Sequence, residues 1–264
     1  MRTKDMRKQT SVDLIKKQQL AWAGTARLLL DKDGYCLDLK QNVFRNLSPL
    51  ARTELLAGDG GELGRDGKRC KAQALHSSAI LACNFFDYWR GRDLTPLAQV
   101  FGTGELCGLR FEAKFPTGLC GKSPNIDVVL YEWADSILAI ESKFTEPFRT
   151  SHTKGYLKPK YFETPDMWAR VGLTGCQALA DQLRMNHAHF EILDVAQLLK
   201  HMLGLATNQS RTKHTKWRFC CLWYRPAGAD GDLHAAGAGS LCHADWSRRD
   251  PFLRIDVPRG VSSA

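Results

Sequence analysis

An acidic residue opens one strand-like stretch of the chain, and a second acidic residue and a lysine close the next. They are Asp127, Glu141 and Lys143. Because residues two apart in a strand point to the same face, Glu141 and Lys143 are expected to project together. Residues 134–135 between the stretches are few enough for a tight hairpin, which would make the two strands antiparallel. The start of one strand then lies beside the end of the other, so we expect Asp127 and Glu141 to meet at one edge of a sheet.

The chemistry that such an arrangement favours is metal-dependent. Two neighbouring carboxylates resist joint ionisation unless a cation lies between them. Mg²⁺ prefers oxygen ligands of this kind and keeps waters that can act as nucleophiles, and Mn²⁺ is expected to substitute for it. Lys143 could orient an attacking water or stabilise charge on a phosphate. The simpler interpretation is a salt bridge between Glu141 and Lys143 at a strand end, but it leaves the position of Asp127 unexplained.

Glu112, in the strand-like stretch before Asp127, is a further candidate metal or water ligand. Its charged neighbours Arg110 and Lys114 alternate with apolar residues, as on any half-exposed strand. From the residues alone, a place in the site and a place on the surface both stay open for Glu112.

The hydrophobic pattern predicts the elements that must position these residues. Helices are predicted over residues 12–30, 77–90, 175–186 and 190–203, and strands over 109–115, 126–133, 136–143 and 217–224, with a short edge strand over 253–257. Leu81 and Phe85 recur at helical spacing, so their face of the second helix is expected to be buried. Gly204 is expected to end the fourth helix. The glycine-rich residues 58–64 predict either a domain linker or a loop packed on the core.

This order of elements indicates an α/β fold, more fully an α+β protein whose mixed sheet is covered by helices. The predicted core has the order helix-strand-strand-strand-helix-strand. We expect residues 1–70 to form a helical N-terminal extension packed on that core, and residues 71–264 to form the domain that carries the candidate site.

Two segments of the chain resemble the paired signature of the PD-(D/E)XK nuclease superfamily, and the predicted core is similar to its restriction-endonuclease-like fold. The segments are Pro124-Asn125-Ile126-Asp127 and Ile140-Glu141-Ser142-Lys143. The proline stands three residues before the aspartate rather than immediately before it. A longer context, over residues 60–225, resembles a family of proteins within it that are assigned as restriction endonucleases. That context consists of Gly60-Gly-Glu-Leu63, Leu75-His-Ser-Ser78, Asn84-Phe85-Phe86, Phe111-Glu112, Ile140-Glu-Ser-Lys-Phe-Thr-Glu146 and Gln182-Leu183-Arg184.

The resemblance implies a role for each candidate residue. It places five side chains in the active site, namely Asp127, Glu141, Lys143, Glu112 and Gln182. The first two would bind the metal together with the backbone carbonyl of Ser142, the lysine would be catalytic, and Glu112 would lie close enough to be a further ligand. Gln182, on the following helix, would face the same pocket. From its sequence position alone, Gln182 could instead be a polar residue beside the core.

The charge of the chain favours a nucleic-acid partner. The net charge is +9 and the pI is near 9.1, which favours a polyanion. Basic and aromatic residues are mixed in the loop after the lysine, and such a loop could follow a phosphate backbone and stack bases. We expect four of its residues to contact DNA, namely Arg149, Lys154, Lys158 and Lys160. A solvated basic loop is the alternative.

The composition argues against several other classes of protein. Nine cysteines are an odd number and no Cys-x-x-Cys occurs, so neither a disulfide framework nor a zinc site is expected. No apolar run approaches the ~18 residues of a membrane span, and no apolar signal-peptide core follows the charged N-terminus. We therefore expect a cytoplasmic protein without a membrane partner.

The favoured hypothesis is a Mg²⁺-dependent endonuclease that hydrolyses DNA, of restriction type or acting in DNA repair or recombination. The competing interpretation is a non-catalytic nucleic-acid-binding protein that retains the nuclease fold, and a hydrolase of smaller phosphoesters is a third. A homodimer would allow both DNA strands to be cut, and a restriction role would bring in a cognate DNA methyltransferase. The sequence leaves both of these partners open.

Overall fold

The computed structural model describes residues 10–64, 69–148, 156–188, 190, 192–212, 216–226, 232–233, 236 and 253–254. In these residues the helices are α1 (Ser11–Thr25), α2 (Pro49–Ala57), α3 (Ser78–Phe86), α4 (Thr95–Phe101), α5 (Thr174–Arg184) and α6 (Val195–Thr212). The strands are β1 (Leu106–Lys114), β2 (Asn125–Glu132), β3 (Ser136–Lys143), β4 (Lys216–Trp223) and β5 (Leu253–Arg254). Short 3₁₀ turns include η3 (Asp87–Trp89) and η4 (Glu146–Phe148).

The strands form one mixed sheet in the order β1-β2-β3-β4-β5. β2 is antiparallel to both β1 and β3, whereas β4 is parallel to β3 and β5 is parallel to β4. The predicted mixed sheet and the predicted order of its elements are confirmed, with α4 as a helix that the pattern did not predict. The turn between β2 and β3 has three residues, and its last, Asp135, has a φ of 53°. A left-handed residue at that point is common in three-residue hairpin loops.

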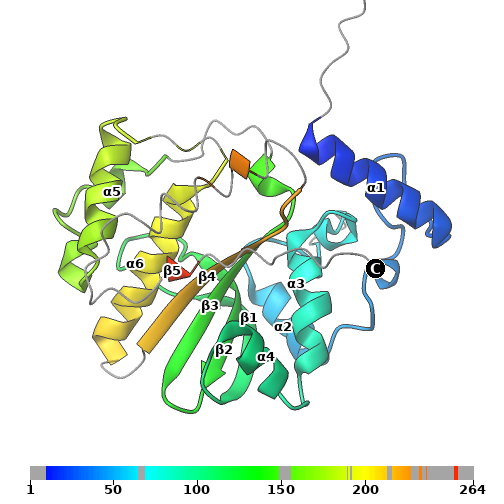
Figure 1. The fold of residues 1–264 in the computed structure, drawn as a ribbon, viewed down its shortest axis with the longest axis horizontal. Coiled ribbons are helices and arrows are strands. Elements are labelled where there is room, and N and C mark those ends of the chain that lie inside the picture. Colours follow the sequence, from blue (N-terminus) through cyan, green and yellow to red (C-terminus); the bar gives the residue numbers. More distant parts are fainter. Residues whose placement is uncertain are drawn as a thin grey trace, which may run out of the picture.

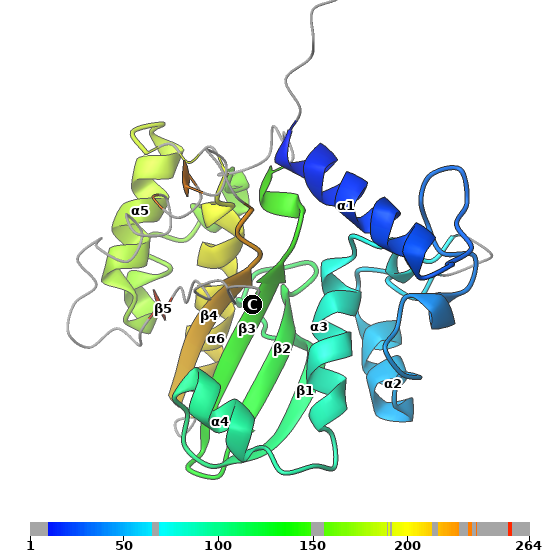
Figure 2. The same ribbon diagram turned by 45° about the vertical axis from the view of Figure 1, so that its right-hand side comes forward.

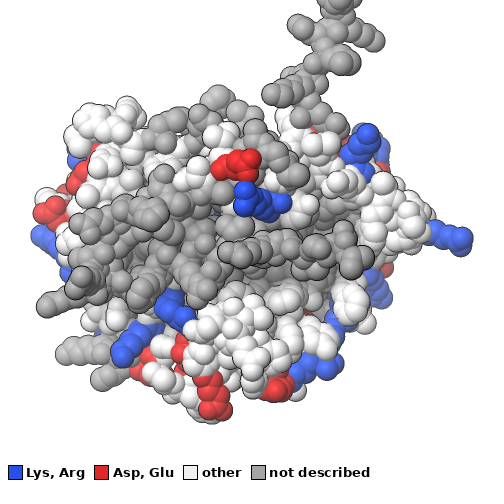
Figure 3. Space-filling model, viewed as in Figure 1, with Lys and Arg blue, Asp and Glu red and all other residues white. Residues whose placement is uncertain are grey.

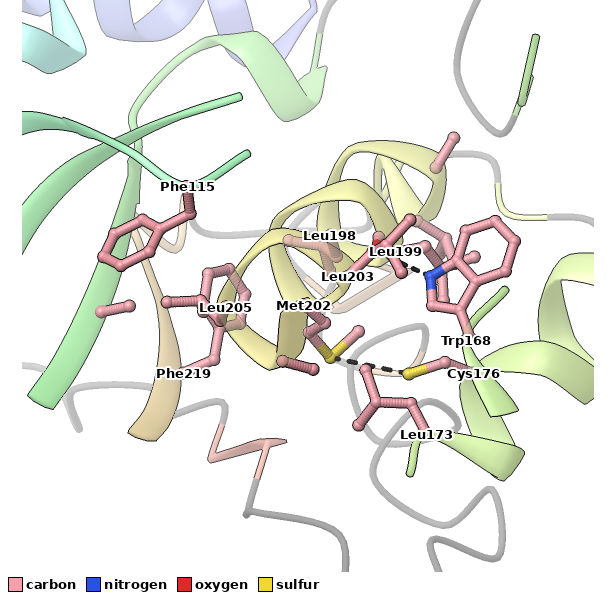
Figure 4. Close-up of a cluster of buried hydrophobic side chains, with 14 of the residues drawn as sticks. Phe115, Trp168, Leu173, Cys176, Leu198, Leu199, Met202, Leu203, Leu205 and Phe219 are labelled. Carbon is pink, nitrogen blue, oxygen red and sulfur yellow. Dashed lines mark hydrogen bonds between the residues drawn. The ribbon is translucent and has the colours of Figure 1, made fainter. Parts of the chain in front are cut away.

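Helices cover both faces of the sheet and give the molecule three layers (Figure 1 and Figure 2). α5 and α6 lie on one face, and α2, α3 and α4 lie on the other. β3 is buried on both faces, as its continuous apolar run predicts for a central strand. The core under α6 includes Trp168, Leu199 and Phe219 (Figure 4). There the Trp168 indole Nε1 donates to the Leu199 carbonyl at 3.0 Å.

Short-range capping signals set the starts of the first three helices. At α1 the Thr10 side chain accepts from the backbone N–H of Asp13, and the Asp13 carboxylate accepts from the backbone N–H of Thr10. This reciprocal pair is a capping box. Ser48 caps α2, with Pro49 in the first turn, and Ser77 caps α3. Of these caps, the one at Ser77 agrees with the helix start predicted there. α1 ends at residue 25 rather than at the predicted residue 30.

The buried face of α3 differs from the prediction. Leu81 and Phe85 are exposed, by 46% and 47%, whereas Ile80, Cys83 and Phe86 are buried in the core against the sheet. Most residues of α3 are apolar, so its sequence does not mark a single inward face. Contact with β2 and β3 selects that face.

α6 begins later and ends later than predicted, and Gly204 lies inside the helix rather than at its end. A Cβ added at Gly204 would lie 2.4 Å from the carbonyl oxygen of Phe115, which is far closer than a carbon and an oxygen can approach without a backbone shift. The glycine therefore allows α6 to pack closely on the chain that follows β1. Gly204 therefore marks a close contact between α6 and the residue after β1, and it does not mark the end of the helix.

The glycine-rich residues 58–64 form a loop packed on the core. A Cβ added at Gly58 would lie 2.7 Å from a carboxylate oxygen of Glu112, and Asp59 forms an ion pair with Lys114 at 3.1 Å. Leu55, in the preceding α2, belongs to the same core cluster as β1. The division of the chain at residue 70 stays a prediction. None of the described helices is long and apolar enough to cross a bilayer.

Candidate active site

Asp127 and Glu141 lie side by side at the end of the β2–β3 hairpin that is away from its turn. β2 and β3 pair in register up to Val128 and Ile140, and Asp127 and Glu141 are the next residues along. The backbone N–H of Ser142 donates to Oδ2 of Asp127 at 2.7 Å, which fixes the aspartate against β3. The structure thus brings these two acids together, as strand alternation and a hairpin predict.

The Glu141 carboxylate is held from three directions. Its Oε1 accepts from Nζ of Lys143 at 2.7 Å and from Nε2 of Gln197 at 2.9 Å. Its Oε2 lies 3.4 Å from Nε2 of His201 but accepts no hydrogen bond from the described residues. Because Glu141 is only 1% exposed, its pair with Lys143 is not the solvated strand-end salt bridge of the simpler interpretation. One buried oxygen of Glu141 is left for a ligand.

The two carboxylates experience opposite electrostatic environments. Burial, followed by the charge of Glu141, raises the pKa of Asp127 well above its usual value, although Lys143 opposes the rise. Burial also acts to raise the pKa of Glu141, but the charges of Lys143 and His201 outweigh burial and lower that pKa. Burial acts to lower the pKa of Lys143, and the charges of Glu141 and Asp127 outweigh it and raise that pKa. Without a cation, a proton therefore binds Asp127 more readily than Glu141.

Glu112 lies in β1 close to these two acids. Its Oε2 accepts from Nδ2 of Asn125 at 2.8 Å. Burial raises the pKa of Glu112 to about 7, the charges of Glu62 and Glu141 add to the rise, and the bond from Asn125 opposes it. The register of β1 and β2, which pairs Phe111 with Val128 and Ala113 with Ile126, puts Glu112 opposite Asp127, so the structure places Glu112 next to the site.

A bend at Glu112 explains why the sequence of β1 reads as an ordinary half-exposed strand. Glu112 has a φ of 51°, a left-handed conformation that is uncommon outside glycine. Before the bend, Leu109 and Phe111 join the core under α3, and after it Ala113 and Phe115 join the core under α6. The alternation of charged and apolar residues in β1 therefore gives no sign that the apolar side chains change from one face of the sheet to the other at Glu112.

Gln182 is not brought to this cluster. It is exposed on α5, and in the described part of the chain no hydrogen bond joins its side chain to Asp127, Glu141 or Lys143. The amide that contacts Glu141 is that of Gln197 on α6. The predicted pocket-facing glutamine is therefore replaced by one on the next helix.

The basic loop after β3 is described only in part. Arg149 and Lys154 lie outside the described residues. Lys160 donates to the carbonyl oxygen of Cys120 at 2.7 Å, so that ammonium group is engaged within the protein. Lys158 is exposed and is the described lysine of the loop that remains most accessible to a ligand.

Lys200 of α6 is a cation near the site that sequence reasoning missed. Burial lowers the pKa of Lys200, the charges of Lys158 and Lys143 add to this effect, and Asp194 opposes it. No described carboxylate lies within ion-pair distance of Lys200. Lys158 and Lys143 therefore each lie near enough to Lys200 to act on its charge.

Sequence reasoning also missed Glu62, Gln197 and His201. Gln197 and His201 are one helical turn apart and both face Glu141, although the surrounding residues of α6 are apolar. Such an i, i+4 polar pair on an apolar face is a signal that could have indicated an inward-facing site. Glu62 stands in the glycine-rich motif at 60–63, and that motif alone gives no sign that its carboxylate approaches Glu112.

The donor set suits a hard cation. Asp127 and Glu141 supply adjacent carboxylates, and Oε2 of Glu141 is buried without a hydrogen bond. Within the residues that the structure describes, no group of three or more His, Cys, Asp or Glu side chains is arranged to hold a metal ion. Structural and catalytic zinc sites need three or four protein ligands, whereas Mg²⁺ is commonly bound by one or two carboxylates together with waters and substrate phosphates. The residues present therefore fit Mg²⁺ better than zinc.

The excess of positive charge is not gathered in one visible patch. Figure 3 shows lysines and arginines interspersed with aspartates and glutamates around the described edges of one face.

Comparison with models of known protein families assigns the chain to a family. The model of a protein family described as Restriction Endonuclease associating with ARP matches residues 16–227, which is well over half of the chain. The chain belongs to this family. No curated protein and no solved structure matches it. The residues that match the restriction-endonuclease family include all of the cluster around Glu141, from Glu62 to His201. The expected membership of a restriction-endonuclease family is therefore confirmed, and the family suggests a nuclease.

Proposed function

We propose that this member of the restriction-endonuclease family is a metal-dependent endonuclease of the PD-(D/E)XK type that hydrolyses phosphodiester bonds in DNA. The observation that carries the proposal is the buried cluster in which Asp127, Glu141 and Lys143 lie together. Family membership supports nuclease chemistry in general. The cluster adds the paired carboxylates and the fixed cation that metal-assisted phosphodiester hydrolysis uses.

Asp127 and Glu141 are the proposed protein ligands of Mg²⁺ or Mn²⁺, with the backbone carbonyl of Ser142 as a third and Glu112 close by. When bound, the metal ion supplies positive charge that offsets the negative charge developing on the phosphate. In its presence Asp127 would stay ionised near neutral pH, because a nearby cation favours the charged form of a carboxyl group.

Lys143 is the proposed catalytic side chain that acts as a donor. Its raised pKa keeps Nζ protonated, so it would donate to a phosphate oxygen or to the attacking water and would not act as a base. Gln197 and His201 would serve as positioning residues, since they restrict how the Glu141 carboxylate can turn. In this proposal the sheet supplies the metal ligands and the hydrogen-bond donor, and α6 orients the Glu141 carboxylate.

Two further lysines are proposed to bind phosphates that flank the cleaved bond. Lys158 is exposed at the loop after β3, and Lys200 lies on α6 near Lys143 and Glu141. Neither forms an ion pair with a described carboxylate, and phosphate groups are the natural partners of such unpaired cations.

The direct test is cleavage of supercoiled plasmid and of single-stranded DNA by the purified full chain with Mg²⁺, with Mn²⁺, and with EDTA. We expect nicked or linear plasmid with either metal and none with EDTA. Asp127→Asn and Lys143→Met should each reduce the rate by at least about 100-fold, the scale on which removal of a key electrostatic group slows catalysis. Lys17→Met, which removes an exposed lysine of α1, is the matched control and should cleave normally.

Cleavage that survives Asp127→Asn in clean preparations would refute the assignment of the site. DNA binding with no cleavage under any of these metal conditions would instead favour the non-catalytic binding protein. Four further points stay predictions. They are the role in restriction, repair or recombination, the homodimer, the partner methyltransferase and the cytoplasmic location.

A further inference from the structure

Two arginines from separate segments stack on one tyrosine beside the end of α3. The guanidinium carbon of Arg45 lies 4.3 Å from the ring centroid of Tyr88, and that of Arg92 lies 4.4 Å from the same centroid. Two atoms at these distances from one point are less than about 9 Å apart, whatever their directions. Stacking of this kind holds a guanidinium group in place while its N–H donors stay available at its edge.

The segment that carries Arg45 is tied to the end of α3 and to η3 by polar contacts. Asn84 accepts from the backbone N–H of Phe44 at 2.7 Å, next to Arg45 in the chain. The Asp87 carboxylate accepts from the backbone N–H and the hydroxyl of Ser48, both at 2.7 Å. These contacts hold the chain on both sides of Arg45 close to Tyr88, and the backbone N–H of Arg92 donates to the carbonyl oxygen of Trp89 at 3.1 Å.

Among the described residues, no acid neutralises the charges of Arg45 and Arg92. No described carboxylate lies within ion-pair distance of either guanidinium group. The acids nearest Arg92 in the sequence make other contacts, since Asp87 binds Ser48 and Arg90 and Asp93 accepts from the backbone N–H of Thr95. Arg45 is partly exposed and Arg92 is exposed. Two unpaired guanidinium groups, held less than about 9 Å apart and open to solvent, have the spacing to contact one phosphate or two neighbouring ones.

We propose that Arg45, Tyr88 and Arg92 form a phosphate-binding site that contacts the DNA backbone away from the cleaved bond. This inference rests on the proposed DNA substrate. α3 links the two places, because the Ser78 hydroxyl at its start donates to the Glu146 carboxylate, just past β3, at 2.7 Å. Tyr88 follows Ser78 by ten residues through α3 and η3, which at rises of about 1.5 Å and 2.0 Å per residue is about 16 Å. At about 3.4 Å per base pair, that distance equals four to five base pairs of duplex.

The test measures the affinity of a fluorescent 20-base-pair duplex in EDTA, so that no cleavage occurs, over a series of salt concentrations. The double variant Arg45→Gln/Arg92→Gln should bind about 10-fold more weakly than the wild type or worse. The slope of log K against log salt should fall by about 2, since each lost phosphate contact removes close to one unit. Tyr88→Leu keeps both charges but removes the stack, and it should weaken binding by a smaller factor.

The control double variant Arg27→Gln/Arg52→Gln removes the same charge from two exposed arginines elsewhere. It should change affinity by less than about 3-fold and leave the salt slope intact. If the two double variants bind alike, or if the wild type does not bind the duplex at low salt, the inference is wrong. A wild type that binds through Arg45 and Arg92 but never cleaves would refute the proposed endonuclease and leave this site standing. If thermal melting shows the double variant to be unfolded, Arg92→Gln alone decides, because Arg92 is the more exposed of the two arginines.

Discussion

For Gly204→Ala, the structure predicts a lower free energy of unfolding, whereas helix propensity predicts a higher one. In the interior of a helix, alanine is favoured over glycine by about 0.8–1.0 kcal/mol, so propensity alone predicts a more stable protein. In this chain the new Cβ would meet the carbonyl oxygen of Phe115 at 2.4 Å and its Cβ at 3.1 Å. Both contacts are with parts of the chain that are packed in the core under α6 (Figure 4), so neither can move aside as an exposed side chain would.

The packing loss should exceed the propensity gain. A carbon and a carbonyl oxygen ordinarily stay about 3.3 Å apart or more, so α6 or the end of β1 must move by nearly 1 Å to accept the methyl group. Overpacking of a core costs about 1–3 kcal/mol and sometimes more, and a backbone obstacle favours the upper end. After the gain is subtracted, we expect Gly204→Ala to lower the free energy of unfolding by about 2 kcal/mol.

Gly24→Ala is the matched control. Gly24 lies in α1, where an added Cβ would meet nothing within 4 Å, so the control keeps the propensity gain and has no clash. It should raise the free energy of unfolding by up to about 1 kcal/mol. At about 2–4 °C per kcal/mol for a chain of this size, Gly204→Ala should lower Tm by about 4–8 °C while Gly24→Ala leaves it unchanged or raises it. A Gly204→Ala protein that melts at or above the wild-type temperature would refute the packing argument.

Three further predictions concern charge. Burial raises the pKa of Glu112 from 4.5 to about 7, so between these pH values the folded state binds more protons than the unfolded state and loses stability as pH rises. In EDTA, Glu112→Gln should therefore raise the urea midpoint more at pH 8 than at pH 5. Equal increases at the two pH values would contradict this. Gln197→Ala removes a donor to Glu141 and should weaken Mn²⁺ binding by about 10–100-fold in calorimetry, with Gln209→Ala on the same helix as a control that should not. Arg90→Ala leaves the carboxylates that it binds buried without their partner and should lower the free energy of unfolding by about 3–5 kcal/mol; a loss under 1 kcal/mol in urea titration would show that the ion pairs contribute little.

The sequence determined the parts of this protein that depend on neighbours in the chain. The apolar run before Glu141 predicts a central strand, because only a strand covered on both faces is apolar at every position. Strand alternation and a short turn are enough to predict that Asp127 and Glu141 meet, because a hairpin sets its own register. The predicted helix start at Ser77 is confirmed for the same reason, since a cap acts within one turn.

Features that depend on contact between distant segments could not be predicted in this way. Leu81 was expected inside and lies outside, because α3 is apolar on more than one side and the sheet selects the buried face. Gly204 was expected to end a helix, since glycine is common both at helix ends and at close packing contacts, and only the position of Phe115 distinguishes the two.

The same division applies to the candidate site. Residues 127, 141 and 143 lie in one hairpin, and the sequence by itself determined that they belong together. Gln197 and His201 reach Glu141 only because the parallel crossover from β3 to β4 returns α6 over that end of the sheet. Periodicity reports which face of an element is apolar, but it does not report which other element that face will meet. The tertiary structure alone therefore decided that Gln197, and not Gln182, contacts the Glu141 carboxylate.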